Sequence, residues 1–170
     1  KEPVLLEIRH AYHADLDALT RLEALCFPPA EAAGLDALRS RLAVYPNHFW
    51  LLWQSGHLVS YVNGPVTDQP DLADWMYHDP SVHREHGAWQ MIFGVGTTPQ
   101  SRSHGCAAQV LRQVIEDAAR QGRKGLGLTC KDALVPYYAR FGFRDEGMSS
   151  SQHGGVAWHQ MRLTLPALTF

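Results

Sequence analysis

The sequence predicts one α/β domain, spanning residues 1–170, in which helices pack against a central sheet. The chain has 170 residues, 45% of them hydrophobic and 19% charged, which suits a single domain with a sizeable core. Between residues 89 and 130, a strand, a long amphipathic helix and a second strand follow one another. Residues 49–62 add two short apolar strands around a glycine-containing turn. Together these patterns indicate the α/β class.

The first half of the chain alternates short strands with helices. Residues 4–8 have the composition of a strand, and the hairpin strands are expected at 49–53 and 58–62. A second helix is expected from about residue 34 to residue 44, where Pro46 stops it. The first helix ends at Phe27-Pro28-Pro29, and its apolar residues recur at helical spacing: Leu16, Leu19, Leu22 and Cys26.

The second half opens with a segment rich in Asp, Pro and His. Residues 67–87 show no clear periodicity, which predicts a long loop or a broken helical excursion that covers the substrate side of the domain. The helix at 105–122 has the strongest apolar repeat in the chain. The other elements are expected at 89–95 (strand), 125–130 (strand), 134–140 (short helix) and 156–165 (strand).

Charge and cysteine content exclude several classes of protein. Fifteen Lys and Arg against 17 Asp and Glu give a net charge of −2, so nothing favours a nucleic acid partner. No apolar run approaches the roughly 20 residues that cross a bilayer, so we expect no membrane partner. Three widely spaced cysteines indicate neither a disulfide framework nor a zinc site, and favour the cytoplasm. The chain begins at Lys1, which leaves open whether a leader precedes it.

The segment before the long helix carries the first chemical signal. Residues 97–107 read TTPQSRSHGCA, so small residues gather where the helix begins. A helix start offers unpaired N–H groups and the positive end of the dipole, which suit a diphosphate. Gly105 permits close approach to this backbone, and Arg102 adds a positive charge. On this pattern alone, helix capping and close packing are the favoured explanation of the glycine. The segment matches neither the Gly-Lys-Ser/Thr loop of triphosphatases nor Gly-x-Gly-x-x-Gly.

These residues resemble the GNAT superfamily of acyl-coenzyme A N-acyltransferases. Its signature Arg/Gln-x-x-Gly-x-Gly/Ala is met by Arg102, Gly105 and Ala107. More specifically, residues 130–143 (CKDALVPYYARFGF) resemble arylalkylamine (serotonin) N-acetyltransferases, and Phe27-Pro28-Pro29-Ala30-Glu31 resembles the first substrate loop of that group. The resemblance covers the chain from Ile8 to Leu165.

The resemblance implies a fold and a cosubstrate. It implies a mixed, largely antiparallel sheet of about six to seven strands with about four flanking helices, splayed where acetyl-CoA binds. Gly94, Val95, Gly96 and Thr97 would hold the pantetheine like an added strand. The pyrophosphate would lie on the amides of Arg102, Ser103, His104, Gly105, Cys106, Ala107 and Ala108.

Tyr138 matches the general acid of the family. A tyrosine with an ordinary pKa of about 10 cannot fully protonate a thiolate whose pKa is roughly 8.5 unless the site lowers the pKa of the tyrosine. A hydrogen bond from the hydroxyl to the sulfur is the other way for it to assist. Packing under a helix is the alternative role for Tyr138, and Tyr137 is the better packing candidate. A backbone N–H near Val95 would contact the oxyanion.

The general base is where the sequence departs from the family. Two histidines relay the proton in arylalkylamine acetyltransferases, and Met91 and Phe93 stand at those positions here. With Phe27, Pro28 and Glu31, they are our expected substrate-binding residues. Possible substitutes for the base are Glu31, Glu85, His86 and His153. His78, His83 and His86 lack a further pair of ligands on a rigid element, so no metal is expected.

The sequence therefore favours an acetyl-CoA-dependent N-acetyltransferase that acts on a small apolar or aromatic primary amine. Two alternatives remain open. One is a peptide or protein N-acetyltransferase, and the other is a catalytically weak CoA-binding sensor. The amine, the base and the choice between monomer and homodimer do not follow from the sequence.

Overall fold

The computed structural model describes residues 5–151 and 153–167. These residues form two compact units, each with one sheet. The first unit contains the chain up to Asn63 together with Gly94–Val114, and the second contains Gly64–Phe93 and the chain from Ile115 onward. Helix α3 (Cys106–Arg120) contributes residues to both units.

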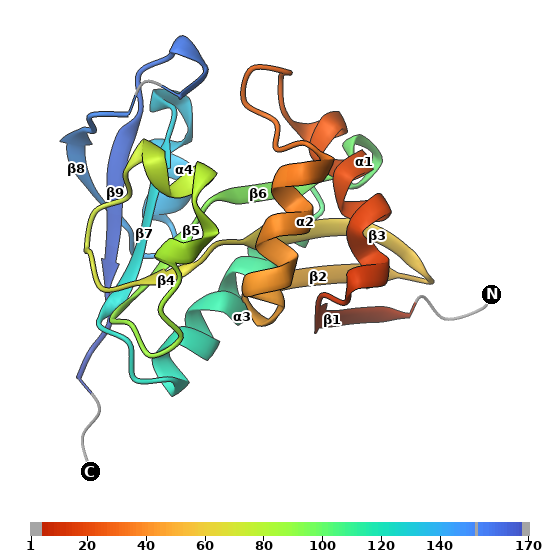
Figure 1. Cartoon of the computed structure of the whole chain (residues 1–170), viewed down its shortest axis with the longest axis horizontal. Coiled ribbons are helices and arrows are strands. Elements are labelled where there is room, and N and C mark those ends of the chain that lie inside the picture. Colours follow the sequence, from red (N-terminus) through yellow and green to blue (C-terminus); the bar gives the residue numbers. More distant parts are fainter. Residues whose placement is uncertain (1–4, 152, 168–170) are drawn as a thin grey trace. The chain divides into compact units, whose positions relative to one another are not determined.

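The first unit is a four-stranded antiparallel sheet covered by two helices. Its strands lie in the order β1 (Leu6–His10), β2 (Phe49–Gln54), β3 (His57–Asn63) and β6 (Gly94–Thr97). Helices α1 (Leu16–Cys26) and α2 (Leu35–Val44) lie on one face of this sheet (Figure 1). Ser55 and Gly56 both have positive φ, which suits the tight turn of the predicted β2–β3 hairpin.

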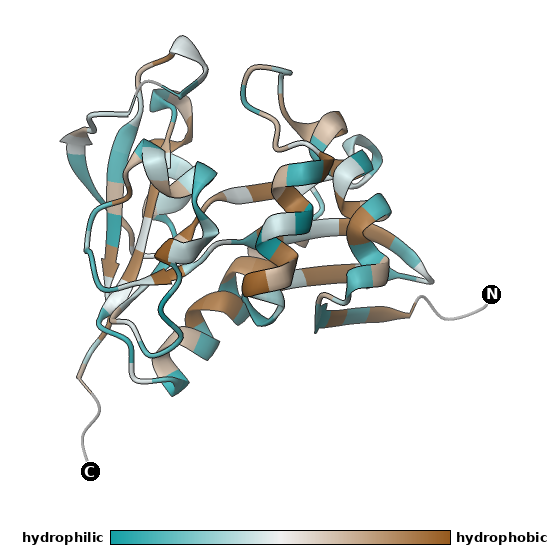
Figure 2. Cartoon of the chain, viewed as in Figure 1, coloured by the Kyte–Doolittle hydropathy of each residue, from teal (hydrophilic) through white to brown (hydrophobic). Residues whose placement is uncertain are grey.

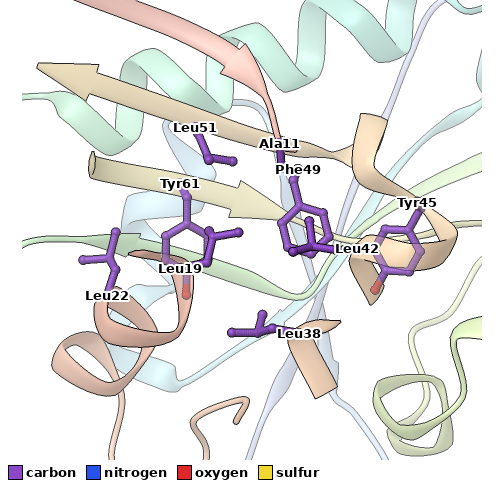
Figure 3. Close-up of a cluster of buried hydrophobic side chains, with 9 residues drawn as sticks. All are labelled: Ala11, Leu19, Leu22, Leu38, Leu42, Tyr45, Phe49, Leu51 and Tyr61. Atoms are coloured by element: carbon purple, nitrogen blue, oxygen red, sulfur yellow. The ribbon is translucent and has the colours of Figure 1, made fainter. Parts of the chain in front are cut away.

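The core of the first unit lies between this sheet and its helices. Leu19 and Leu22 face it from α1 because residues three apart share a helix face, and Leu38 and Leu42 do so from α2. Phe49, Leu51 and Tyr61 alternate inward on β2 and β3 (Figure 3). These side chains are 3% exposed or less. Their burial holds α1 against the strand that borders β6.

The second unit is a five-stranded sheet in the order β4 (Val66–Thr67), β5 (Trp89–Ile92), β7 (Gly125–Cys130), β9 (His159–Thr164) and β8 (Arg144–Met148). Only β5 and β7 pair in parallel, so the mixed, largely antiparallel arrangement is confirmed. The short helix α4 (Val135–Ala139) follows β7. Buried apolar residues recur along α3 at helical spacing: Val110, Leu111, Val114 and Ala118. Figure 2 shows brown and teal segments alternating along this helix.

The strand predicted over residues 89–95 is two strands in two different sheets, which corrects the sequence analysis. β5 pairs with β4 and β7, whereas β6 pairs with β3. The opposing chain carries Gly64-Pro65 at the break, and a proline has no N–H to continue a ladder. The side-chain amide of Gln90 instead donates from Nε2 to the backbone carbonyls of Gly64 and Met91, both at 2.8 Å. The parallel pairing of β5 with β7 ends at Ile92 and Leu128.

Strand β8 was missed by the sequence analysis. Its residues, RDEGM, are polar and mostly exposed, so no apolar alternation marks them as a strand. Its pairing with β9 is reinforced across the strands by a hydrogen bond between His159 and Asp145 and by an ion pair between Arg162 and Glu146. With this strand, the two-residue β4 and the division at Phe93, the described residues contain nine strands rather than the expected six to seven.

The segment at 67–87 is a broken helical excursion, as predicted. It contains two short 3-10 turns, Asp74–His78 and Pro80–Val82. The three cysteines are free thiols. Within the described residues, no helix combines the length and apolar character that spanning a membrane would require.

Candidate active site

The turn between β6 and α3 exposes backbone at the start of a 15-residue helix. Ser103 and Gly105 both adopt positive φ, at 66° and 77°. Arg102 donates from Nε to the Thr97 carbonyl at 3.2 Å, which ties the turn back to the end of β6. Residues 102–105 are exposed, and a Cβ at Gly105 would meet nothing within 4 Å. The turn therefore leaves open space above the helix amides for an anion.

Strand β6 is the last strand of its sheet. On one side it pairs with β3, and Ser60 Oγ donates to the Gly96 carbonyl at 2.8 Å. No strand of the described chain pairs with its other side. An edge of this kind can hydrogen-bond an extended ligand as if it were an added strand. The residues expected to hold pantetheine, Gly94, Val95, Gly96 and Thr97, make up this edge.

Tyr138 lies on α4 in the second unit and is 8% exposed. Burial raises its pKa above the usual 10, and the nearby Tyr137, Cys130 and Tyr77 raise it further. The site does not lower this pKa, so proton transfer to a thiolate gains no help from it. The hydroxyl stays protonated at neutral pH and is suited to donating a hydrogen bond. Tyr137 packs edge-on against the rings of Tyr138 and Phe141, as expected of a packing residue.

An aromatic stack lies beyond the end of β5 in the same unit. Tyr77 stacks on Phe93 with ring centroids 4.3 Å apart, and on His153 at 5.2 Å with the rings nearly parallel. Asp74 accepts a hydrogen bond from Ser151 Oγ at 2.5 Å. The Asp/Pro/His-rich segment is therefore fastened to the loop that carries His153. The resulting surface joins apolar rings with one imidazole.

The predicted substrate-binding residues fall in different surroundings. Met91 is fully buried, with its sulfur against Gly127, whereas Phe93 is half-buried in the stack. Phe27 packs on the core of the first unit. Pro28 is exposed, and its carbonyl accepts from the Glu31 N–H at 2.9 Å, which closes the loop after α1 into a turn.

Glu85 and His86 lie at the wrong end of the second sheet for catalysis beside Tyr138. They precede β5 and line a cavity of about 590 Å³ with residues 121–124, which precede β7. Because β5 and β7 are parallel, this end is opposite the one that leads to Phe93 and Tyr138. Among the base candidates named from the sequence, His153 shares the aromatic stack of Tyr77 with Phe93.

Both ring nitrogens of His83 are engaged. Nδ1 accepts from the Val66 N–H at 3.0 Å, and Nε2 lies 2.7 Å from Glu85. Burial lowers the pKa of His83, in keeping with a neutral ring whose Nδ1 is an acceptor. The imidazole therefore holds the loop in place, and His78 and His86 are exposed.

The structure adds one acidic residue that the sequence analysis overlooked. Glu23 lies on α1, and its side chain points inward with only 5% of the residue exposed. Burial is the main cause that raises its pKa, to about 7, while the Ala33 N–H and the charge of Arg41 oppose the rise. The signal was available, because residue 23 falls one turn after Leu19 on the apolar stripe.

Comparison with known proteins assigns these features to one family. Residues 16–165 match the family model described as the acetyltransferase (GNAT) domain. The chain belongs to the GNAT acetyltransferase family. The membership of the GNAT superfamily that the sequence motifs indicate is thereby confirmed.

Relatives within the GNAT family are distant. Serotonin N-acetyltransferase from Mesocricetus auratus is 25% identical over 138 residues, which are 80% of this chain and 65% of that protein. The loading GNATL domain of CurA from Lyngbya majuscula has a TM-score of 0.82 and 15% identity, covering 94% of this chain and 98% of that one. The GphF GNAT-like decarboxylase in complex with isobutyryl-CoA has a TM-score of 0.75 and 22% identity, covering 93% and 98%. These structures share the fold.

Proposed function

We propose that this chain transfers the acetyl group of acetyl-CoA to the primary amine of a small apolar or aromatic acceptor. The observation that carries the acceptor class is the stack of Phe93, Tyr77 and His153 in the unit that holds Tyr138. Flat, apolar rings recognise hydrophobic or aromatic bodies rather than polyamines. The serotonin N-acetyltransferases, to which the chain is similar, act on an amine of this kind.

Two segments of the first unit suit acetyl-CoA. The free edge of β6 would hydrogen-bond the pantetheine, and the exposed amides at the start of α3 would hold the pyrophosphate, with Arg102 adding charge. The open space above Gly105 leaves room for this group. Bound acetyl-CoA supplies the activated acetyl thioester.

Tyr138 would act on the departing thiolate. As the amine nitrogen bonds to the acetyl carbon, the C–S bond breaks and its electron pair stays on sulfur. The Tyr138 hydroxyl, kept protonated by its burial, would donate a hydrogen bond to this sulfur. The proton that finally rests on the thiol comes from the attacking nitrogen.

Decarboxylation of an acyl-CoA is the second candidate. A GNAT-like decarboxylase shares the fold, and the apolar Met91 and Phe93 favour this chemistry here, since loss of CO2 requires no base for an amine. Acetyl transfer releases a free thiol, whereas decarboxylation leaves the thioester intact. The two reactions therefore have different products.

The test is an acceptor panel. Acetyl-CoA is offered with aromatic amines, aliphatic amines, polyamines and peptides while free thiol is monitored, and malonyl-CoA is offered alone while CO2 is measured. We expect thiol release with aromatic or apolar amines above all others. Faster thiol release with peptides than with small amines would show that the acceptor is a peptide or protein. Release of CO2 without thiol would select the decarboxylase, and acetyl-CoA binding without either reaction would indicate a sensor.

A further inference from the structure

Three buried polar atoms on one side of β6 have no hydrogen-bond partner in the part of the chain that the structure describes. They are Oε2 of Glu23, the hydroxyl of Tyr61 and Oδ1 of Asn63. The three residues are 5%, 0% and 1% exposed. Buried polar atoms are nearly always paired, because leaving them unpaired loses their hydrogen bonds to water. The cluster therefore calls for water or a ligand group.

Tyr61 and Asn63 place this cluster against the glycines of β6. Their cross-strand partners are Gly96 and Gly94, so their side chains share a face with these glycines. A Cβ at Gly94 would lie 3.2 Å from Asn63 Nδ2 and 3.7 Å from the Tyr61 hydroxyl. Figure 3 shows the Tyr61 ring reaching from β3 toward the helices, where its cluster includes Leu19 and Leu22 of α1.

Glu23 belongs to the same face through Cys26, three residues further along α1. The Cys26 thiol donates to the Thr97 carbonyl at 3.3 Å. Its sulfur lies 3.0 Å, and Tyr61 Cε1 lies 2.6 Å, from the point where a Cβ of Gly96 would be. Residues three apart share a helix face, so Glu23 also faces β6. Its Oε1 accepts the Ala33 N–H at 3.0 Å, which fixes the carboxyl beside the loop that begins at Phe27.

We propose that Glu23 accepts the proton that the acceptor ammonium must lose, through water that Tyr61 and Asn63 hold beside β6. The inference rests on the proposed acetyl transfer. The ammonium gives one proton through water to the Glu23 carboxylate, which later releases it to solvent. The neutral nitrogen then attacks the thioester, and its second proton goes to the thiolate. Tyr61 and Asn63 are positioning residues, and Glu23 replaces the base that Met91 and Phe93 cannot provide.

The charged and titratable groups around Glu23 are compatible with this role. Arg41 of α2 favours the ionised carboxylate, while burial favours the neutral acid more strongly, and the balance brings the pKa to about 7. Cys26 on α1 remains a neutral thiol, because burial raises its pKa although Arg102 opposes the rise. The Tyr61 ring of β3 and the Cys26 sulfur approach the same point beside Gly96. A carboxyl with a pKa near the working pH accepts and releases protons readily.

The test compares pH profiles of kcat/KM for the wild type and Glu23→Gln, with an amine of pKa about 10. We expect the wild type to show an inflection near pH 7. Glu23→Gln keeps an oxygen that accepts the Ala33 N–H, but its amide accepts no proton. Its kcat/KM should therefore follow the fraction of amine that is already neutral in solution. Its deficit should be about 10²-fold at pH 7 and should shrink steadily toward pH 10. Glu23→Asp should retain the inflection, and Tyr61→Phe should lower the rate while acetyl-CoA binding is unchanged.

Glu116→Gln is the matched control, because this exposed carboxylate of α3 pairs with Arg120 and has no role in the proposed reaction, so its removal should leave the profile unchanged. A deficit in Glu23→Gln that is the same at every pH would show a purely structural role and overturn the proposal. An inflection that persists in Glu23→Gln and disappears in Glu31→Gln or His153→Gln would reassign the base. Acetyl-CoA binding without thiol release from any amine in the wild type would instead overturn the proposed acetyl transfer itself.

Discussion

Tyr138 differs from an exposed tyrosine in the acidity of its hydroxyl. Its ring lies among Tyr137, Phe143 and the end of β7, and burial raises its pKa. A raised pKa makes complete proton transfer to a thiolate less favourable than for a free tyrosine. The same burial keeps the donor proton in place throughout the neutral range. Its contribution is therefore a hydrogen bond to developing charge, as an oxyanion hole provides.

Replacing Tyr138 with Phe removes only this hydroxyl. We expect kcat to fall about 10²-fold, because one proton-donating contact is lost in the transition state. The affinity for acetyl-CoA, measured by calorimetry, should stay within a factor of two or so of the parent. Tyr137→Phe is the control and should be near wild type. Equal rates for Tyr138→Phe and the parent, where chemistry limits turnover, would remove Tyr138 from the mechanism.

Glu23 also links stability to pH. Its pKa is raised from 4.5 to about 7 on folding. Such a group contributes its stability fully below pH 4.5, and this contribution is lost as pH rises through 7, because the unfolded chain ionises more easily. Glu23→Gln cannot ionise and does not lose this contribution. Between pH 4.5 and pH 8, its free energy of unfolding should therefore rise by ~1–3 kcal/mol relative to that of the wild type.

Urea unfolding at a series of pH values measures this difference. Glu116→Gln again serves as the control, because it removes one exposed carboxylate from α3 and leaves Glu23 in place. A difference between wild type and Glu23→Gln that does not change with pH would show that the carboxyl titrates normally. The measurement requires no substrate, so it is independent of the proposed reaction.

At the scale of elements, the junction of β6 and α3 explains why the sequence motif looks as it does. Gly105 has a φ of 77°, a conformation that side chains with a Cβ rarely adopt. The space around it is empty, so packing does not require glycine. Conformation alone accounts for the residue in the free protein. To test whether Gly105 also has a role in binding, the substituted side chain must tolerate this φ and fill the space beside the backbone.

Gly105→Asn meets this requirement, because Asn accepts the left-handed region better than most residues. The added side chain lies where the diphosphate is expected, so acetyl-CoA affinity should fall at least about tenfold. Gly56→Asn is the matched control, with a φ of 83° and equally open surroundings in the β2–β3 turn. Thermal stabilisation by acetyl-CoA measures both. Equal stabilisation in the two variants would place the diphosphate elsewhere.

At the scale of the whole molecule, the chain passes between its two compact units three times. The passages follow Asn63, Phe93 and Val114, and the last of them lies inside helix α3. Opening a helix in its middle breaks the backbone hydrogen bonds of the turns on both sides. Neither unit is thus a continuous stretch of chain that folds independently of the other.

We therefore expect the chain to unfold as a single domain. Calorimetry should give one transition whose van't Hoff and calorimetric enthalpies agree. Acetyl-CoA should move that transition as a whole, because a ligand of the folded state stabilises everything that unfolds with its site. Two transitions, only one of which responds to acetyl-CoA, would show that the units unfold separately.

The sequence by itself determined the elements with strong local patterns. The stripe of α1, the hairpin with its Ser-Gly turn and the repeat of α3 each depend on neighbours within a few residues, so periodicity predicts them. The motifs that resemble the family could also be identified from the sequence, because each is a contiguous stretch of chain. They are Arg102 with Gly105 and the segment around Tyr138. The family assignment follows from these alone.

Only the tertiary structure decided how distant residues combine. Polar β8 becomes a strand because β9 supplies hydrogen bonds and an ion pair. β5 separates from β6 where Pro65, between β3 and β4, interrupts the opposing ladder. The pKa of Glu23 depends on what buries it, and the stack of Phe93, Tyr77 and His153 joins three segments far apart in the chain. Such properties arise from contacts across the fold, which local sequence patterns do not encode.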